Sequence, residues 1–270
     1  MRRVILFFLL CGLGANAEET ASPKKDSAPP IEINAGSMIA DQKESSVLLK
    51  GKVEAIQGDT HLWADEVWGV APPGTQFGFK NPKIVEAKGK VIARIQNQTG
   101  SADTATYKTN DRHLHLEGKN VHLISKNQRL TSYESIDYWE DDLKAIARNN
   151  VILHVKDKII KTDELVVFFK KNTDGRLELT HAYSPKRVSI ATPEEVFIGD
   201  KGEYNASAGI VTLEGNVSVT RLSDQSRLSG AYATVNLNTG VSRVYATPPV
   251  TSQAKSVPIQ GKLPAKEKKT

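Results

Sequence analysis

The chain has 270 residues, a formal net charge of +5 at pH 7 and one cysteine, Cys11, in its N-terminal apolar run. Disulfide bonds and thiolate chemistry are therefore not expected in an exported, processed chain. A lipoprotein anchor at Cys11 is disfavoured, because the preceding Leu10 is bulkier than lipoprotein processing accepts. The modest positive charge fits an anionic partner such as a phosphorylated glycolipid, but a solvated surface rich in lysine is the simpler explanation.

The N-terminus has the layout of a cleavable export signal. Arg2 and Arg3 precede an apolar run that ends at Leu13, and a small-residue motif that ends at Ala17 follows. About ten apolar residues are too few to span a bilayer. We expect cleavage after Ala17, which leaves a periplasmic chain that begins at Glu18 and has a net charge of +3. Nucleic acid is not expected as a partner of an exported chain.

The predicted organisation has four segments. They are a signal peptide at 1–17, a disordered linker at 18–30, a repeat domain at 31–247 and a disordered basic tail at 248–270. The linker and the tail are polar, contain prolines and show no periodicity. The repeats run without interruption, which favours one continuous body over separate modules.

Each repeat is built around a valine that often follows Gly-Asn or Gly-Lys. The clearest copy is GIVTLEGNVSV, Gly209 to Val219, in which apolar residues alternate. A second half-unit follows at a nearly fixed distance, which identifies a true repeat. The six anchors are Val53, Val91, Val121, Val151, Val188 and Val217. Twelve residues after the first five anchors come Asp65, Asp103, Tyr133, Asp163 and Asp200.

The repeat units predict an all-β fold. Apolar residues alternate with a period of two, and the units are rich in Val, Ile, Thr and Gly. The one helix-like stretch, Tyr133 to Leu143, aligns with Asp103 to Leu114 of the neighbouring unit and is also interpreted as strand, turn and strand. We expect two facing sheets of stacked antiparallel strands.

The recurring aspartates resemble the paired carboxylates of glycosidases. A residue that recurs once per unit is more simply structural, so we expect these side chains to accept hydrogen bonds from turn or edge backbone N–H groups. The sequence has no Ser-His-Asp order, nucleophile elbow or phosphate-binding glycine loop. No enzymatic activity, catalytic residue or cofactor is predicted.

His113 and His115 are predicted to share one face of a strand, with Leu114 and Leu116 on the other. This is the spacing of a metal-binding pair, and His122 is near. No cysteine or carboxylate cluster completes a ligand set in the sequence. The histidines are therefore predicted to face solvent, and no metal site is predicted.

A row of modest apolar side chains follows the repeats. Its simplest role is a hydrophobic core, but in two sheets that stay partly open it would line a groove suited to acyl chains. A chain of about a dozen carbons gains about 10 kcal/mol on burial, before ordering costs. Val121 and Leu123 are expected on opposite faces, so aspartate at each is the proposed probe of the groove. The candidate lipid-binding residues are Val53, Leu62, Ala64, Val91, Val121, Leu123, Leu130, Val151, Leu153, Ile160, Val217, Val219 and Leu228.

The repeated Gly-Asn-Val and Gly-Lys-Val motifs, with QGD at 57–59 and AD at 64–65, resemble the OstA/LptA family of periplasmic lipopolysaccharide-transport proteins. The resemblance covers Ile31 to about Val121 and again Tyr204 to Ala246, and it weakens between them. It implies an open β-jellyroll whose apolar interior holds lipid A acyl chains. It also implies protomers joined end to end between the inner and outer membranes, with lipopolysaccharide and the transport components of both membranes as partners.

Three alternatives stay open. A membrane-anchored relative needs a longer apolar N-terminus than this chain has, and a β-solenoid carbohydrate-active enzyme would gather acidic residues in one groove. A structural envelope protein of the same fold is the third.

The two ends of the stack are predicted to be unpaired strand edges. They lie near Ile31–Ala40 and Val241–Ala246, and such edges template further pairing. Pairing of the first edge with the last edge of another copy is heterologous and need not close. We therefore predict a head-to-tail homo-oligomer that a proline at Ile33 or Val244 weakens.

Overall fold

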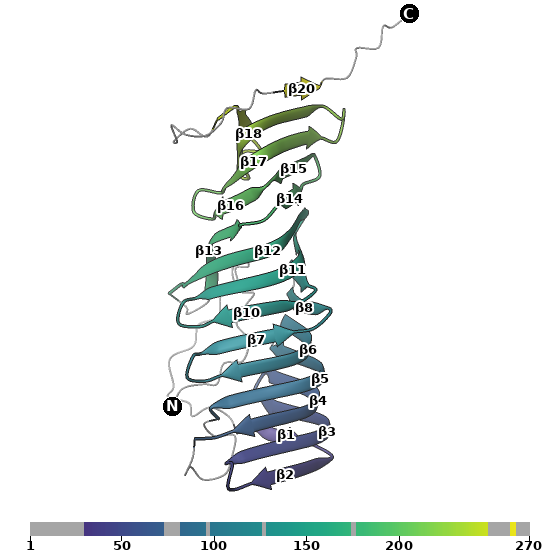
Figure 1. Cartoon of the computed structure of the whole chain (residues 1–270), viewed down its shortest axis with the longest axis vertical. Coiled ribbons are helices and arrows are strands. Elements are labelled where there is room, and N and C mark those ends of the chain that lie inside the picture. Colours follow the sequence, from purple (N-terminus) through teal and green to yellow (C-terminus); the bar gives the residue numbers. More distant parts are fainter. Residues whose placement is uncertain are drawn as a thin grey trace, which may run out of the picture. The chain divides into compact units, whose positions relative to one another are not determined.

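The computed structural model describes residues 30–72, 82–95, 98–125, 128–173, 177–247 and 260–262. These residues form twenty β-strands and no helix (Figure 1). In this described part, no helix is long and apolar enough to cross a membrane. The predicted signal peptide, 1–17, lies outside the described residues, and its cleavage stays a prediction. The strands are β1 (Glu32–Asn34), β2 (Ser37–Asp41), β3 (Ser46–Gln57), β4 (Thr60–Val70), β5 (Ile84–Ile95), β6 (Gln98–Lys108), β7 (His113–Glu117), β8 (Val121–Ser125), β9 (Gln128–Ser132), β10 (Ser135–Trp139), β11 (Lys144–Val155), β12 (Lys158–Lys171), β13 (Leu177–Ser184), β14 (Val188–Ala191), β15 (Glu195–Gly199), β16 (Lys201–Asn205), β17 (Ile210–Arg221), β18 (Arg227–Asn236), β19 (Ser242–Tyr245) and β20 (Gln260–Lys262).

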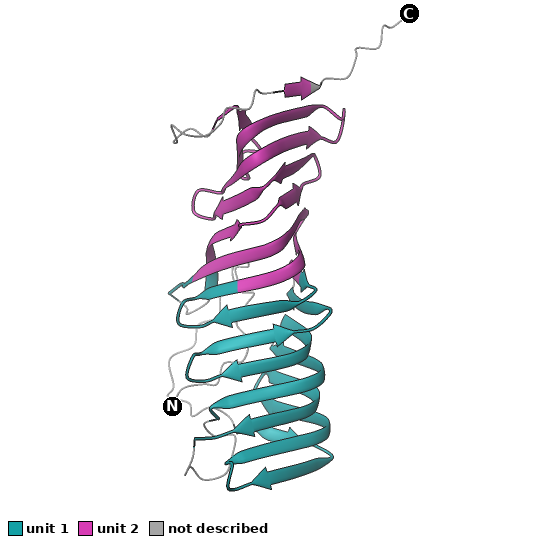
Figure 2. Cartoon of the chain, viewed as in Figure 1, with its two compact units in different colours: residues 1–126, 131–145, 170–178 teal, residues 127–130, 146–169, 179–270 magenta. Residues whose placement is uncertain are grey.

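The chain divides into two compact units, coloured separately in Figure 2. Unit 1 takes residues 1–126, 131–145 and 170–178, and unit 2 takes residues 127–130, 146–169 and 179–270. The range predicted as one repeat domain therefore contains parts of both units. That domain boundary stays a prediction.

Unit 1 has two antiparallel ladders that share its long strands. In the first ladder, β2 pairs with the start of β3, and the end of β4, the start of β5, the end of β6, β7 and β10 follow. In the second ladder, β1 pairs with the end of β3, and the start of β4, the end of β5, the start of β6 and β8 follow. The long strands β3 to β6 pass from one ladder to the other, and the register shifts where they cross.

The crossing points explain the Gly-Lys-Val motif. Gly51 and Lys52 have φ of 82° and 51°, and Gly89 and Lys90 have φ of 76° and 48°. Two successive left-handed residues add length to one strand only, which forms a bulge and bends the strand sharply. Glycine takes this conformation without a steric penalty, and the lysine after it is held there by the pairing on both sides. We call each such point a corner.

Unit 2 repeats this arrangement. In its first ladder, β13 pairs with β16, and the start of β17, the end of β18 and β19 follow. In its second ladder, β12 pairs with β14, and β15, the end of β17, the start of β18 and β20 follow. Gly215 and Asn216 form the corner of β17, with φ of 72° and 44°. In the more divergent repeat, Asn149 and Asn150 take the same conformation, which asparagine tolerates better than other non-glycine residues.

Alternate side chains of both ladders are buried on the inner surface of each unit. The predicted fold class, an all-β open β-jellyroll of stacked antiparallel strands built from repeats, is confirmed. The helix-like stretch Tyr133 to Leu143 contains β10, as predicted for a strand. One buried apolar cluster of unit 2 contains Val188, Ile190, Phe197, Val211, Leu213, Val217, Val219, Ala233 and Val235.

The C-terminal range 248–270 differs from the expectation of a tail without structure at one place. Residues 260–262 form β20, which pairs with Arg227–Ser229 of β18. The sequence QGK has no strand pattern, so the free backbone groups at the edge of β18 are the physical reason for this strand. Residues 248–259 and 263–270 lie outside the described residues.

Candidate functional site

The inner surface of unit 1 contains the predicted lipid-binding residues of its repeats. Val53, Ala64, Val91, Val121 and Leu123 are buried there, and Val121 has no exposed surface. Leu62 is partly buried. These residues all belong to the second ladder, where their side chains line one wall of the interior.

The predicted lipid-binding residues of unit 2 differ in how far they are exposed. Four are buried, two are partly buried and one is exposed. Leu228 is the exposed residue, at 45%, because its strand lies at the end of the ladder and only β20 covers it. The buried residues are Leu130, Val151, Val217 and Val219, and the partly buried ones are Leu153 and Ile160.

Sequence reasoning missed the opposite wall. The predicted residues of β3, β4, β5, β8, β12, β17 and β18 all lie in the second ladder of their unit, whereas equally buried residues of the first ladder precede the corner glycines. The signal was present, because apolar residues stand two and four positions before the corner glycine. The missed pairs are Val47 and Leu49 before Gly51, Leu114 and Leu116 before Gly118, and Val211 and Leu213 before Gly215.

The expectation that Val121 and Leu123 lie on opposite faces is wrong. Both are buried in β8, because side chains two positions apart in a strand leave the same face. The outer face of β8 carries His122 and Ile124 instead, and Ile124 is 39% exposed.

The recurring aspartates Asp65 and Asp103 lie against Gly89 and Gly118, respectively. A Cβ on Gly89 would overlap the carboxylate of Asp65, and a Cβ on Gly118 would lie 2.8 Å from Asp103 Oδ2. The backbone N–H of Lys119 donates to Asp103 Oδ2 at 3.1 Å, as predicted for a structural aspartate. The aspartate and the glycine are therefore two parts of one corner.

In unit 2 the two ladders also meet at the side opposite the corner, which we call the seam. Ser242 Oγ, at the start of β19, donates to Glu195 Oε2, at the start of β15, at 3.1 Å. A pocket of about 250 Å³ lies at this seam and reaches the core residues Phe197 and Val235. Its other lining residues are Asp157, Lys158, Thr192, Pro193, Glu194, Glu195, Asn236, Leu237, Gly240 and Ser242.

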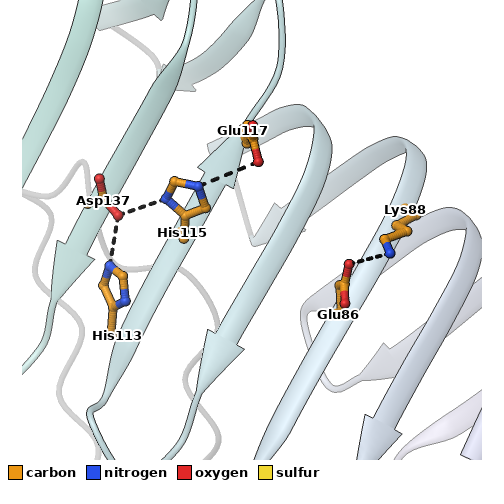
Figure 3. A network of polar contacts seen from close by, with 6 residues as sticks. All are labelled: Glu86, Lys88, His113, His115, Glu117 and Asp137. Carbon is orange, nitrogen blue, oxygen red and sulfur yellow. Dashed lines mark hydrogen bonds and ion pairs between the residues drawn. The ribbon is translucent and has the colours of Figure 1, made fainter.

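The histidine pair lies on the outer face of unit 1 (Figure 3). His113 Nε2 and His115 Nδ1 both lie 2.8 Å from Asp137 Oδ1, and Asp137 is only 6% exposed. The ring of His113 stacks on Trp139 with a centroid separation of 4.7 Å. The two histidines share a face, as predicted, but they are partly buried and contact Asp137 instead of simply facing solvent. Asp137 was missed because it lies opposite His115 only in the folded register of β7 and β10.

No metal site follows from this cluster. Both ring nitrogens are at hydrogen-bond distance from one carboxylate oxygen, and His115 Nε2 lies 3.7 Å from the exposed Glu117. Within the described ranges, no group of three or more His, Cys, Asp or Glu residues is arranged to hold a metal ion. Nearby on the same face, Lys88 Nζ lies 2.6 Å from Glu86 Oε1, and this pair raises the pKa of Lys88 (Figure 3).

A second polar cluster in unit 1 surrounds Glu140. Tyr107 Oη donates to Glu140 Oε1 at 3.0 Å, and Arg112 Nη2 donates to Glu140 Oε2 at 2.6 Å. Burial raises the pKa of Tyr107 to about 12, and the negative charge of Glu140 adds to this effect. The cluster joins three segments of the chain and has no reactive nucleophile.

Comparison with known proteins identifies the family. Residues 32–138 and 134–241 each match the family model described as "LptA/(LptD N-terminal domain) LPS transport protein". The chain belongs to this family. The family resemblance predicted from the sequence is thus confirmed, and the two matches overlap at residues 134–138, which include most of β10.

No curated protein sequence matches the chain. Among solved structures, the chain is similar to LptH from Pseudomonas aeruginosa, described as the LptA homologous periplasmic component of the lipopolysaccharide transport device. The sequences are 12% identical, the match covers 88% of this chain and 96% of that chain, and the TM-score is 0.24. A TM-score this low carries no argument, so the family assignment rests on the sequence model.

Proposed function

We propose that this protein carries lipopolysaccharide through the periplasm, holding lipid A acyl chains against its apolar inner surface. Its family consists of lipopolysaccharide-transport proteins, which supports the class of cargo. The observation that carries the proposal is the pair of apolar walls in each unit, formed by alternate side chains before and after every corner. Acyl chains need shape and apolar surface for binding, and no reactive residue.

Binding requires the two ladders to separate. Val121 and Leu213 have no exposed surface, so their side chains are packed against protein. The seam pocket, at about 250 Å³, is below the range of about 300–1,000 Å³ typical of ligand sites. Each acyl methylene that moves from water to the apolar interior gains about 0.8 kcal/mol, so an acyl chain of about a dozen carbons offsets a substantial opening cost.

The seam is the side at which the ladders of unit 2 would separate. At the corner, β17 passes covalently from one ladder to the other through Gly215 and Asn216. At the seam, a side-chain hydrogen bond from Ser242 to Glu195 joins the two ladders above the apolar residues Phe197 and Val235. One such bond contributes about 0.5–1.5 kcal/mol net, or up to about 3 kcal/mol with a charged acceptor, so it yields before the backbone does.

Photocrosslinking in cells tests the cargo and its place. A photoreactive residue is placed at Val91 or Leu123, which face inward, and at their outward neighbours Ile92 or Ile124. The two positions of each pair are neighbours on one strand. The two variants are therefore expected to be similar in the amount of protein and in the distance of the photoreactive group from the membranes. We expect lipopolysaccharide adducts from the two inward positions and few from the outward ones. Equal adducts from both faces, or none from any position, would contradict the proposal.

Transfer between protomers would use the strand edges. All five residues of β2 are exposed, and Met38 and Ile39 are 64% and 57% exposed at the edge of unit 1. Pairing of this edge with β19 of a second copy would place one apolar interior beside the next. The partners are then further copies of the chain and the transport components of the inner and outer membranes. The pairing is testable by sedimentation.

The proposed compartment is the periplasm, reached through the predicted signal peptide 1–17. Intact mass spectrometry of the protein from envelope fractions is expected to give a chain that begins at Glu18. A retained Met1 or an acylated Cys11 would contradict this expectation.

A further inference from the structure

We propose that β20 is a displaceable edge strand that blocks the end of unit 2 until a second copy of the chain takes its place. The inference rests on the proposed head-to-tail assembly and adds a control to it. The end strand β18 is covered in two pieces. β19 pairs with Tyr232–Val235 in the first ladder, and β20 pairs with Arg227–Ser229 in the second.

The side chains of β20 cover little of the surface they face. Gln260 and Gly261 are exposed. Gly261 stands opposite Leu228, which stays 45% exposed because the glycine has no side chain to lie across it. β20 therefore satisfies backbone N–H and C=O groups of the edge but buries little apolar area. The net stabilisation from a few backbone hydrogen bonds is comparable to the entropy cost of ordering three residues, so the contact is weak.

Leu228 belongs to the inner surface, because it stands opposite the buried Val219 in the ladder. Its exposure leaves the end of the apolar wall open. A strand with an apolar side chain opposite Leu228 would extend the wall, and β20 does not supply one.

The first strand of a second copy has the required residue. β1 begins the second ladder of unit 1, and Ile33 stands opposite Ala55 on the inner side, where Ile33 is 38% exposed. Among the described residues, β1 pairs with β3 alone, so its other edge is available. Placing β1 of one copy along Arg227–Ser229 of another would bury Ile33 against Leu228. This pairing would join the second ladders of the two copies, just as pairing of β2 with β19 would join their first ladders.

Pairing of β20 with the edge of β18 protects the monomer from association with other copies. Exposed strand edges promote uncontrolled association, and short edge strands are a common way to block them. Because β20 must leave before a second copy can pair, the apparent affinity between copies falls by the fraction of molecules with a free edge. Assembly is thereby held back at low protein concentration and proceeds when copies are concentrated or held together by a membrane partner.

Two variants with opposite expected effects test the inference. Removal of residues 248–270 frees the edge and is expected to tighten self-association several-fold. Gly261→Val is expected to weaken self-association several-fold, because a Cβ at this position lies 3.4 Å from Leu228 Cδ2, an ordinary contact that covers the leucine. Gln260→Val, one residue away on the other face of β20, controls for strand propensity and is expected to have a smaller effect.

Sedimentation measures association, and hydrogen exchange at low concentration measures protection of the amides of Arg227–Ser229 in the monomer. Full-length protein is expected to show protection that the truncated chain lacks. Absence of protection in the full chain would overturn the inference. The inference would also be overturned if the full chain shows protection but the truncation leaves association unchanged or weakens it. In that case the proposed head-to-tail assembly would still stand. If neither form associates at any concentration, both the inference and the proposed assembly fail.

Discussion

Gly215 lies directly against Asp200, and a Cβ on this glycine would come within 2.8 Å of Asp200 Oδ2. The same aspartate oxygen accepts a hydrogen bond from Asn216 Nδ2 at 2.6 Å, and Arg187 Nη1 lies 3.3 Å from Oδ1. The corner of β17 is thus formed by a left-handed glycine, a left-handed asparagine and an aspartate from the preceding segment. Glycine is required here both for its φ of 72° and for the space that it leaves.

Gly240 provides a matched control for these two requirements. It has φ of 71°, close to that of Gly215, but a Cβ there would meet no atom within 4 Å. We expect Gly240→Ala to lower the free energy of unfolding by about 1–2 kcal/mol, from backbone strain alone. Gly215→Ala should cost a further 1–3 kcal/mol or so, from overlap with Asp200. Urea unfolding measures both, and equal losses would show that the aspartate contact has no energetic role.

Alkaline pH is predicted to destabilise unit 1. Burial raises the pKa of Tyr107 to about 12 in the folded protein, and burial also raises the pKa of Tyr138 to about 12. An unfolded tyrosine has a pKa of about 10. The folded state therefore favours the protonated phenol, and its stabilisation is fully present below about pH 10 and is lost as pH rises towards 12.

Unfolding measured in urea between pH 9 and 11.5 checks this prediction. A two-unit shift corresponds to a loss of up to about 3 kcal/mol per tyrosine, which is complete only when pH passes the folded-state pKa, so part of this loss is expected by pH 11.5. Tyr107→Phe is expected to make the fall shallower, and Tyr133→Phe, at an exposed tyrosine, controls for removal of a phenol in general. An identical fall in the Tyr107→Phe variant would argue against a buried, protonated Tyr107.

The corners were predictable from sequence because their information is local. In Gly-Lys-Val and Gly-Asn-Val, two residues with positive φ precede a valine whose side chain is buried in the interior. Asn149 and Asn150 keep this conformation in a repeat that has no glycine at the corner. The alternation of apolar residues specifies the strands for the same reason. Each pattern is complete within about ten residues, so no knowledge of the partner strand is needed.

The parts of the structure that were missed depend on register between segments far apart in the sequence. Asp137 joins His113 and His115 only because β10 pairs with β7 so that Asp137 stands opposite His115. The first-ladder wall was missed for a different reason, since the candidate residues are counted from the valine after each corner and those before the corner glycine fall outside that count. β20 was missed because the edge of β18, and not the sequence QGK, determines that strand.

A carboxylate on the inner surface is predicted to unfold unit 1 locally, whereas one on the outer surface is tolerated. Val121 is fully buried in β8, and Ile124 on the same strand is 39% exposed. Val121→Asp places an unpaired charge among apolar side chains, which costs several kcal/mol. Ile124→Asp is expected to change the free energy of unfolding by less than about 1 kcal/mol.

Thermal unfolding and hydrogen exchange in β6 and β8 distinguish these two variants. If both unfold at the temperature of the unmodified protein, the interior is more open to water than its burial indicates. Such a result would also weaken the argument that the ladders must separate to admit an acyl chain.

Strand β2 forms an edge of unit 1. Ile39 is 57% exposed on β2, whose pairing with β3 is the one strand contact described for it. A lysine on an edge strand is a common natural obstacle to pairing by another strand, because a strand added alongside would take water away from its charge. Ile39→Lys is therefore expected to weaken head-to-tail association by about tenfold or more, equivalent to about 1.4 kcal/mol. Lysine keeps the backbone N–H of β2, whereas a proline at Ile33 or Val244 also removes a donor within the protomer's own end strands.

Ile92→Lys is the matched control for this change. Ile92 is 39% exposed on the outer face of β5, between β4 and β6, and is therefore not at an edge. Both variants add the same charge and remove the same apolar side chain, so a difference between them reports on position alone. Sedimentation across a range of protein concentrations is expected to show weaker association for Ile39→Lys only. If both lysines weaken association equally, net charge controls it, and β2 is not the contact edge of the proposed bridge.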